Sequence, residues 1–77
     1  MNAKVRFMKG DQYSRIEYLC NIDQRMPLEK LKIDDLVVVK TPFKLEFGVV
    51  TDISETGKND YKYTLLTVVP DPDQVIL

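Results

Sequence analysis

Two apolar runs separated by a short turn constrain the fold of this chain more than any other feature. The first run covers residues 36–40 and the second covers residues 47–53, with Thr41-Pro42-Phe43 between them. Short Val-rich runs bounded by Pro, Gly and charged residues are typical of buried strands. The two runs therefore predict a pair of adjacent strands at the centre of a small β-barrel.

Strand alternation gives the first run a register, because successive side chains point to opposite faces. Leu36 and Val38 share one face, and Val37 and Val39 share the other. A strand that is apolar on both faces is expected to be covered on both, so Val38→Asp is expected to unfold the domain. Gly48, inside the second run, predicts a bend that curls the sheet.

Three more strands are predicted, at 4–8, 13–20 and 61–69, which makes five in all. The first two form a hairpin around a Gly-containing turn. Val5 and Phe7 share one face of its first strand. Alternation along its second strand places three side chains on one inward face, namely Ile16, Tyr18 and Cys20.

The segments between these strands are predicted from their turn chemistry. Residues 21–35 form a connector with one helical turn that opens at Pro27. Residues 54–60 form a polar hairpin loop, and residues 70–77 form a C-terminal tail after a single domain at 1–69. Three apolar side chains of the connector are expected to close one end of the barrel: Leu28, Leu31 and Ile33.

Composition argues against most catalytic chemistry. The chain has 77 residues, no histidine and one cysteine, Cys20, so the commonest general base and an internal disulfide are both absent. Asp34 and Asp35 would point to opposite sides of an extended segment, and Asp71 and Asp73 flank Pro72, so neither pair makes a metal cage. We expect no enzymatic activity, no cofactor and no metal.

Charge and cysteine usage bear on partners and on the place of action. The net charge is −1, without the basic excess that is common in nucleic-acid-binding domains. No run approaches the ~20 apolar residues of a membrane span, so no membrane association is expected. A lone thiol predicts a reducing cytoplasm. Because a chain this short buries little surface, a homodimer is an alternative to a monomer.

Aromatic and basic side chains in and near the predicted turns are the candidate binding residues. Loops on a rigid barrel commonly carry binding function, which favours a protein-binding surface at the turn 41–46. Aromatic rings beside cations also hold single-stranded nucleic acid, which is the alternative. The candidate residues are Tyr13, Lys40, Phe43, Lys44, Tyr61, Lys62 and Tyr63.

Residues 16–53 resemble the N-terminal DNA-binding barrel of the bacterial primosomal helicase. The resemblance rests on Ile16-Glu17-Tyr18-Leu19, on the Val-rich strand that ends in Thr41-Pro42-Phe43, and on Phe47-Gly48-Val49-Val50. It implies an SH3-like barrel of five strands, and an OB-like barrel is the alternative. In that family a Phe-Asp pair and a Gly-Asp turn help to form a pocket for a DNA 3′ end.

Three family positions differ in this chain. Ile16-Glu17 replaces the Phe-Asp pair, Asp34 replaces the glycine of the turn, and Lys44 replaces the glycine after Pro-Phe. The chain also resembles short SH3-like proteins of bacteriophages and mobile elements. The sequence therefore predicts an all-β, SH3-like binding module that binds protein, with single-stranded nucleic acid as the alternative ligand.

Overall fold

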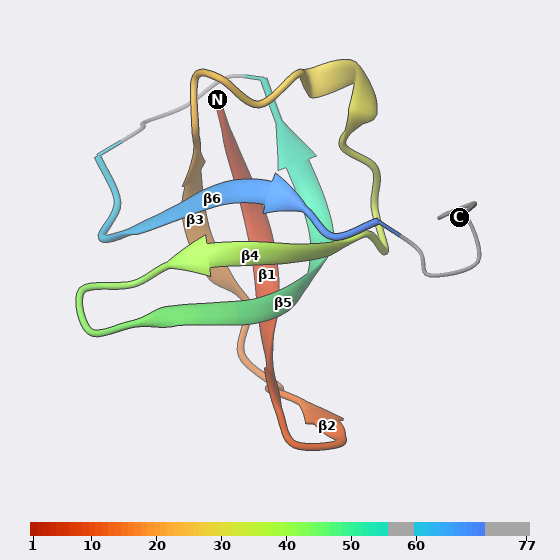
Figure 1. Cartoon of the computed structure of the whole chain (residues 1–77), viewed down its shortest axis with the longest axis vertical. Coiled ribbons are helices and arrows are strands. Elements are labelled where there is room, and N and C mark those ends of the chain that lie inside the picture. Colours follow the sequence, from red (N-terminus) through yellow and green to blue (C-terminus); the bar gives the residue numbers. More distant parts are fainter. Residues whose placement is uncertain (56–59, 71–77) are drawn as a thin grey trace.

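The computed structural model describes residues 1–55 and 60–70. Within them the chain is all-β, with a single 3₁₀ turn at Leu28–Lys30 where Pro27 was predicted to open a helical turn (Figure 1). The six strands are β1 (Asn2–Lys9), β2 (Gln12–Tyr13), β3 (Tyr18–Ile22), β4 (Leu36–Lys40), β5 (Leu45–Ser54) and β6 (Tyr63–Val68).

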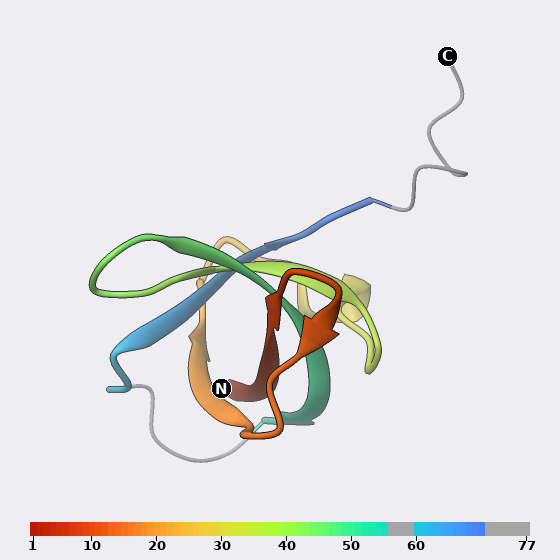
Figure 2. The same ribbon diagram turned by 90° about the horizontal axis from the view of Figure 1, so that it is seen from below.

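Five of these strands close into a barrel, which confirms the predicted architecture and is consistent with an SH3-like barrel. The order around the barrel is β1-β3-β6-β4-β5, and β5 pairs with β1 to complete the ring (Figure 2). The two-residue strand β2 pairs only with the end of β1, through Met8 and Lys9. It extends the β1 hairpin beyond the barrel wall (Figure 1).

The strand order is not a simple meander, because β6 is inserted between β3 and β4. Five strands cannot alternate in direction all the way round a closed ring, so at least one neighbouring pair must run parallel. That pair is β3 and β6, in which Cys20, Asn21 and Ile22 lie opposite Tyr63, Thr64 and Leu65. The other pairings in the ring are antiparallel.

Strand β5 belongs to two ladders at once. Its residues 45–49 pair with β4, and its residues 48–54 pair with β1. Gly48 lies where the two ladders overlap, opposite both Val37 and Phe7. A Cβ at this position would collide with the Val5 side chain and lie 3.0 Å from the Arg6 carbonyl oxygen. Gly48 is therefore a close approach to β1 that only glycine permits, and the irregularity in the β1–β5 ladder lies between Lys4 and Val5.

The core lies inside the ring and follows the predicted alternation. Val5, Phe7 and Cys20 are buried as expected, and β4 buries Val37 and Val39. The side chains on the opposite face of β4, Leu36 and Val38, are only half-buried. Among the described residues, the buried apolar side chains are Ala3, Val5, Phe7, Cys20, Leu31, Val37, Val39, Val50 and Leu65.

Two predicted core residues are wrong: Ile16 of the predicted strand 13–20 and Ile33 of the predicted connector 21–35 are both exposed. Ile16 is 63% exposed because the ladder between the first hairpin strands is interrupted at residues 14–17. At the break, the Phe7 N–H donates to the Ser14 hydroxyl oxygen (3.1 Å), and that hydroxyl donates to the Ile16 carbonyl oxygen (2.8 Å). The Ser14 hydroxyl thus substitutes for part of the missing ladder.

The second wrong residue is Ile33, which is 55% exposed beside a tight turn. Leu31, which was predicted to close the same end of the barrel, is buried. The Leu28 side chain is not among those that the structure describes. In the turn, Asp34 has a φ of 77°, and its N–H donates to the Val50 carbonyl oxygen at 2.8 Å. Aspartate tolerates this left-handed region better than most residues. Asp34 therefore keeps the backbone conformation of a glycine turn.

The predicted polar loop and tail are described only in part. Residues 56–59 of the loop and 71–77 of the tail lie outside the described residues. Val69 is described, and its N–H donates to the Leu36 carbonyl oxygen at 2.8 Å. The end of the described chain is thereby held against the start of β4.

The two faces of β4 should respond differently to a charge. Val39→Asp would bury an unpaired carboxylate at a fully buried position, at a cost of about 3–5 kcal/mol, comparable to the whole stability of a small domain. Val38 is half-buried on the outer face, so Val38→Asp should leave the protein folded, contrary to the expectation from sequence. Thermal melts followed by circular dichroism should show no cooperative transition for Val39→Asp and a retained one for Val38→Asp. Equal melting of the two variants would contradict the register of β4.

Candidate functional site

An open groove of about 180 Å³ lies at one mouth of the barrel. It is formed where β1 and β5 separate, because their ladder ends at the pair Phe7 and Gly48. Beyond that pair, β1 continues toward β2 while the β4–β5 hairpin extends in another direction (Figure 1). The lining residues are Phe7, Lys9, Tyr18, Thr41, Phe43, Glu46 and Tyr63.

Three aromatic rings cluster in this groove. Phe7 of β1 lies 4.9 Å from Tyr18 of β3 and 5.6 Å from Tyr63 of β6, measured between ring centroids. The rings of Tyr18 and Tyr63 are 5.5 Å apart in an edge-to-face arrangement. Such contacts add about 0.5–1.5 kcal/mol per pair beyond burial, so the rings stabilise the mouth as well as lining it.

The tip of the β4–β5 hairpin presents a fourth ring, that of Phe43, to solvent. Thr41 pins this tip: its hydroxyl donates to the Lys44 carbonyl oxygen at 2.7 Å, and its backbone N–H donates to the same oxygen at 2.9 Å. The Thr41 hydroxyl oxygen also accepts the N–H groups of Phe43 (3.2 Å) and Lys44 (3.1 Å). The backbone around Phe43 is therefore held, although its side chain is 94% exposed.

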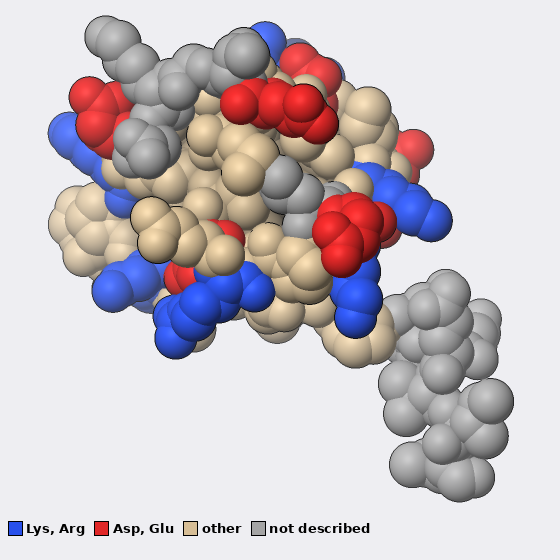
Figure 3. All heavy atoms as spheres, turned by 90° about the horizontal axis from the view of Figure 1, so that it is seen from above, with Lys and Arg blue, Asp and Glu red and all other residues tan. Residues whose placement is uncertain are grey.

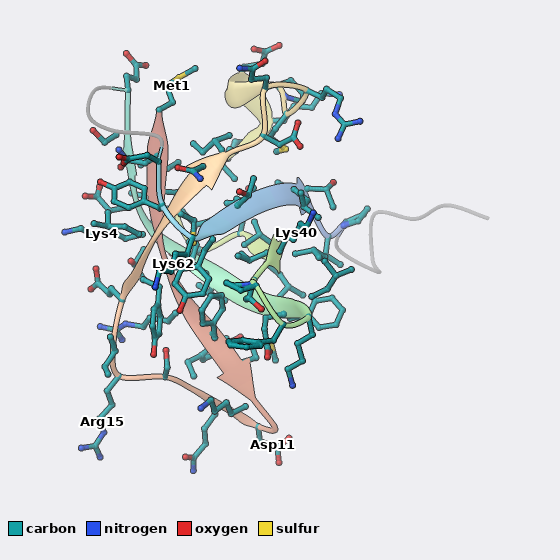
Figure 4. The ribbon with its side chains drawn as sticks, turned by 90° about the vertical axis from the view of Figure 1, so that its left-hand side faces the viewer. Met1, Lys4, Asp11, Arg15, Lys40 and Lys62 are labelled. Carbon is teal, nitrogen blue, oxygen red and sulfur yellow. The ribbon has the colours of Figure 1, made fainter. Side chains whose placement is uncertain are left out.

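Charged side chains of both signs surround the groove. Lys9 and Glu46 line it directly, and Lys44 pairs with Glu46 at 3.2 Å. Lys40 ends β4 next to Thr41, and Lys62 precedes β6 next to Tyr63. Figure 4 shows Lys40 and Lys62 at mid-height of the molecule. Figure 3, seen from above, shows that the opposite end of the barrel also carries both basic and acidic side chains.

The structure brings some of the predicted binding residues to the groove and leaves others away from it. Phe43 and Tyr63 line the groove, and Lys44 contacts its lining residue Glu46. Tyr13 is 48% exposed on β2 and is not part of the lining. In Figure 4, Asp11 and Arg15 mark the hairpin end where β2 lies.

Tyr61 differs from the prediction because it precedes β6 and does not share a strand face with Tyr63. Its backbone is held by Asn21 of β3: the amide nitrogen of Asn21 donates to the Tyr61 carbonyl oxygen at 2.9 Å, and the Tyr61 N–H donates to the Asn21 amide oxygen at 3.1 Å. Asn21 also reaches the Thr64 hydroxyl at 3.4 Å. This clamp aligns β6 beside β3.

Sequence reasoning missed three of the lining residues. Phe7 and Tyr18 were assigned to the core and the inner wall, and the structure shows that they also form the floor of the mouth. No local signal marks them as a site, because only closure of the barrel brings their strands together with β6. The third missed residue is Lys9, whereas Thr41 and Glu46 are the ends of the predicted turn 41–46.

The described residues offer little reactive chemistry. No group of three or more histidine, cysteine, aspartate or glutamate side chains that could hold a metal ion occurs in residues 1–55 and 60–70. Cys20 is buried, and its Sγ donates to the Tyr18 carbonyl oxygen at 3.6 Å. Burial raises the pKa of the Cys20 thiol from 9.0 to about 12, so it stays protonated at neutral pH.

The fold and the groove define a small closed β-barrel with an aromatic mouth. No protein-family description, no curated protein and no solved structure matches the chain. In the part of the chain that the structure describes, no helix is both long and apolar enough to cross a membrane.

Cys20 should be unreactive in the folded protein. Because the thiolate is the reactive form and the folded pKa is about 12, Ellman's reagent at pH 8 should modify native protein at least about a hundredfold more slowly than protein in denaturant. A folded pKa above the ordinary value means that the thiol stabilises the fold fully below pH 9, and that this contribution falls as pH rises toward 12. Rapid labelling of native protein would contradict the burial of Cys20.

Proposed function

We propose that this protein is a non-enzymatic binding module that binds a segment of a partner protein in the groove at its aromatic mouth. The observation that carries the proposal is Phe43, which is 94% exposed on a backbone fixed by Thr41. An exposed ring on a fixed backbone has only its two side-chain torsions to lose on binding, and aromatic anchors dominate protein interfaces.

The composition of the groove favours a peptide segment as the ligand. Phe43 and the Phe7–Tyr18–Tyr63 cluster supply apolar contact area, and Lys9 and Glu46 supply one charge of each sign beside it. A mainly apolar site with a few polar groups is typical of recognition grooves. The partner segment would carry one or two apolar anchors next to charged residues.

The proposed place of action is the cytoplasm, and the proposed origin is a bacteriophage or another mobile element. The cytoplasmic location rests on the lone Cys20, because an unpaired, buried thiol fits a reducing compartment. The second rests on the resemblance to short SH3-like proteins. Neither affects the argument for the groove.

The test is selection of peptides from a display library by the purified protein. Phe43→Ala should reduce binding of the selected peptides at least about tenfold, because truncation of an aromatic anchor costs about 1–2 kcal/mol or more. Ile16→Ala is the matched control, since Ile16 is 63% exposed and lies outside the groove lining. The proposal fails if no peptide is enriched, or if Phe43→Ala and Ile16→Ala bind equally well.

Single-stranded nucleic acid is a second candidate ligand. Lys9 lines the groove, and three more lysines adjoin its lining residues: Lys40, Lys44 and Lys62. A nucleic-acid base stacked on Phe43 would therefore bring its backbone beside several cations. Against this, Lys44 is already paired with Glu46, whose carboxylate would repel phosphate. The Glu46 carboxylate in the groove lining and the net charge of −1 therefore favour the peptide.

Fluorescence anisotropy with a labelled oligodeoxythymidylate of about 16 nucleotides tests this candidate. If single-stranded DNA binds here, the logarithm of the association constant should fall linearly with the logarithm of salt concentration. The double variant Lys40→Gln/Lys62→Gln should reduce that slope by about 1.4, at about 0.7 for each lost phosphate contact. Lys4→Gln, on the opposite end of β1 from Lys9, is the control. Absence of binding at low salt would exclude the candidate.

A further inference from the structure

One edge of β5 has no neighbour among the described strands. The ladder between β1 and β5 ends at Phe7 and Gly48, and beyond it β1 pairs with β2 through Met8 and Lys9. The segment Leu45–Phe47 is therefore paired with β4 on one side only. In Figure 1 the β4–β5 hairpin projects away from β1, with β5 on its lower side.

The backbone groups of this edge have a defined direction. The Val50 N–H donates to the Asp35 carbonyl oxygen at 3.0 Å, so the N–H and C=O groups of Val50 point toward β4. In an antiparallel ladder these groups alternate along the strand, so those of Gly48 and Glu46 also point toward β4. The groups of Leu45 and Phe47 consequently point away from β4, toward the open edge.

The side chains along the edge are mainly apolar. Phe43, Leu45 and Phe47 are 94%, 60% and 54% exposed. An exposed apolar edge with outward-pointing backbone groups is a template for pairing with another strand. Lys44 and Glu46 are the charged residues of this segment, and their mutual ion pair places them on the same face of the strand.

The sequence of the edge is complementary to itself. Residues 43–47 read Phe-Lys-Leu-Glu-Phe. In an antiparallel pair of two such segments centred on Leu45, Lys44 lies opposite Glu46 of the other copy. Phe43, which belongs to the turn before β5, falls at the position opposite Phe47. Opposite charges and aromatic pairs are the favourable cross-strand combinations. This register also suits the backbone, because the N–H and C=O groups of Leu45 point outward. They would form hydrogen bonds with the C=O and N–H groups of Leu45 of the second copy.

We propose that two copies of this chain associate through the β5 edges, antiparallel and centred on Leu45, to form one continuous sheet across a two-fold axis. Pairing centred on Glu46 would instead place two carboxylates opposite each other, which disfavours that register. The central residues of this interface, Leu45 and Phe47, are not part of the groove lining, whereas Phe43 and Glu46 belong to both surfaces.

Sedimentation velocity of the full chain tests the association. From about 10 μM to about 1 mM protein, the weight-average mass should rise from that of the 8.9 kDa monomer toward that of a dimer. Leu45→Lys places like charges on the two-fold axis and should raise the dimer dissociation constant at least about tenfold. Ile33→Lys, at a site 55% exposed on another part of the surface, is the matched control and should leave the constant unchanged.

A charge-swap cycle tests the register. Lys44→Glu and Glu46→Lys should each weaken the dimer about tenfold, because each places like charges opposite one another. The double variant Lys44→Glu/Glu46→Lys should recover dissociation within about threefold of the original protein, since it restores opposite pairs. Circular dichroism of each variant checks that these exposed changes leave the barrel folded.

Three results would overturn the proposal. A chain that stays monomeric over the whole concentration range has no such interface. Association that is unaffected by Leu45→Lys uses another surface. A double variant that stays as weak as the single variants excludes the register centred on Leu45. If Leu45→Lys abolishes association while peptide binding persists, the dimer is supported and peptide binding does not require it.

Discussion

The whole structure depends on β5 pairing with two different strands. Its first half forms a ladder with β4 and its second half with β1, and the two ladders overlap at Gly48 and Val49. Without a side chain at Gly48, the backbones of β1 and β5 can approach closely enough for both ladders to form. This approach closes the ring, buries Val5 and Val50 against each other's strands, and directs the start of β5 away from β1.

The groove follows from the same geometry. Because β5 leaves β1 at Gly48, the barrel is open at one mouth, and the rings of Phe7, Tyr18 and Tyr63 fill part of the opening. The hairpin that β5 forms with β4 then extends past the mouth and places Phe43 beside it. One departure of β5 from β1 therefore produces both the aromatic mouth and the free edge at Leu45–Phe47.

The sequence predicts the local features well and the long-range ones poorly. The alternation of Val37 and Val39 and the burial of Cys20 depend only on strand periodicity, and the structure confirms them. The pairing of β3 with β6 depends on contacts such as that between Asn21 and Tyr61, which are 40 residues apart, and no local pattern reports such a pair. The mouth was recognised only in part for this reason, since its three rings come from strands that closure alone brings together. Ile16 and Ile33 were misplaced because Ser14 and Asp34 end the regular backbone earlier than hydrophobicity suggests.

The position of β6 has a consequence for how the chain can fold. It is the last strand among the described residues, yet it fills the space between β3 and β4, which are formed earlier along the chain. Until residues 63–68 arrive, β3 and β4 both have an unpaired edge, and the core side chains of both remain open to water on that side. Closure by a distant strand predicts slow folding, because the entropy of a long loop must be lost before the contacts form. During synthesis on the ribosome, the nascent barrel therefore stays open until residues 63–68 have emerged.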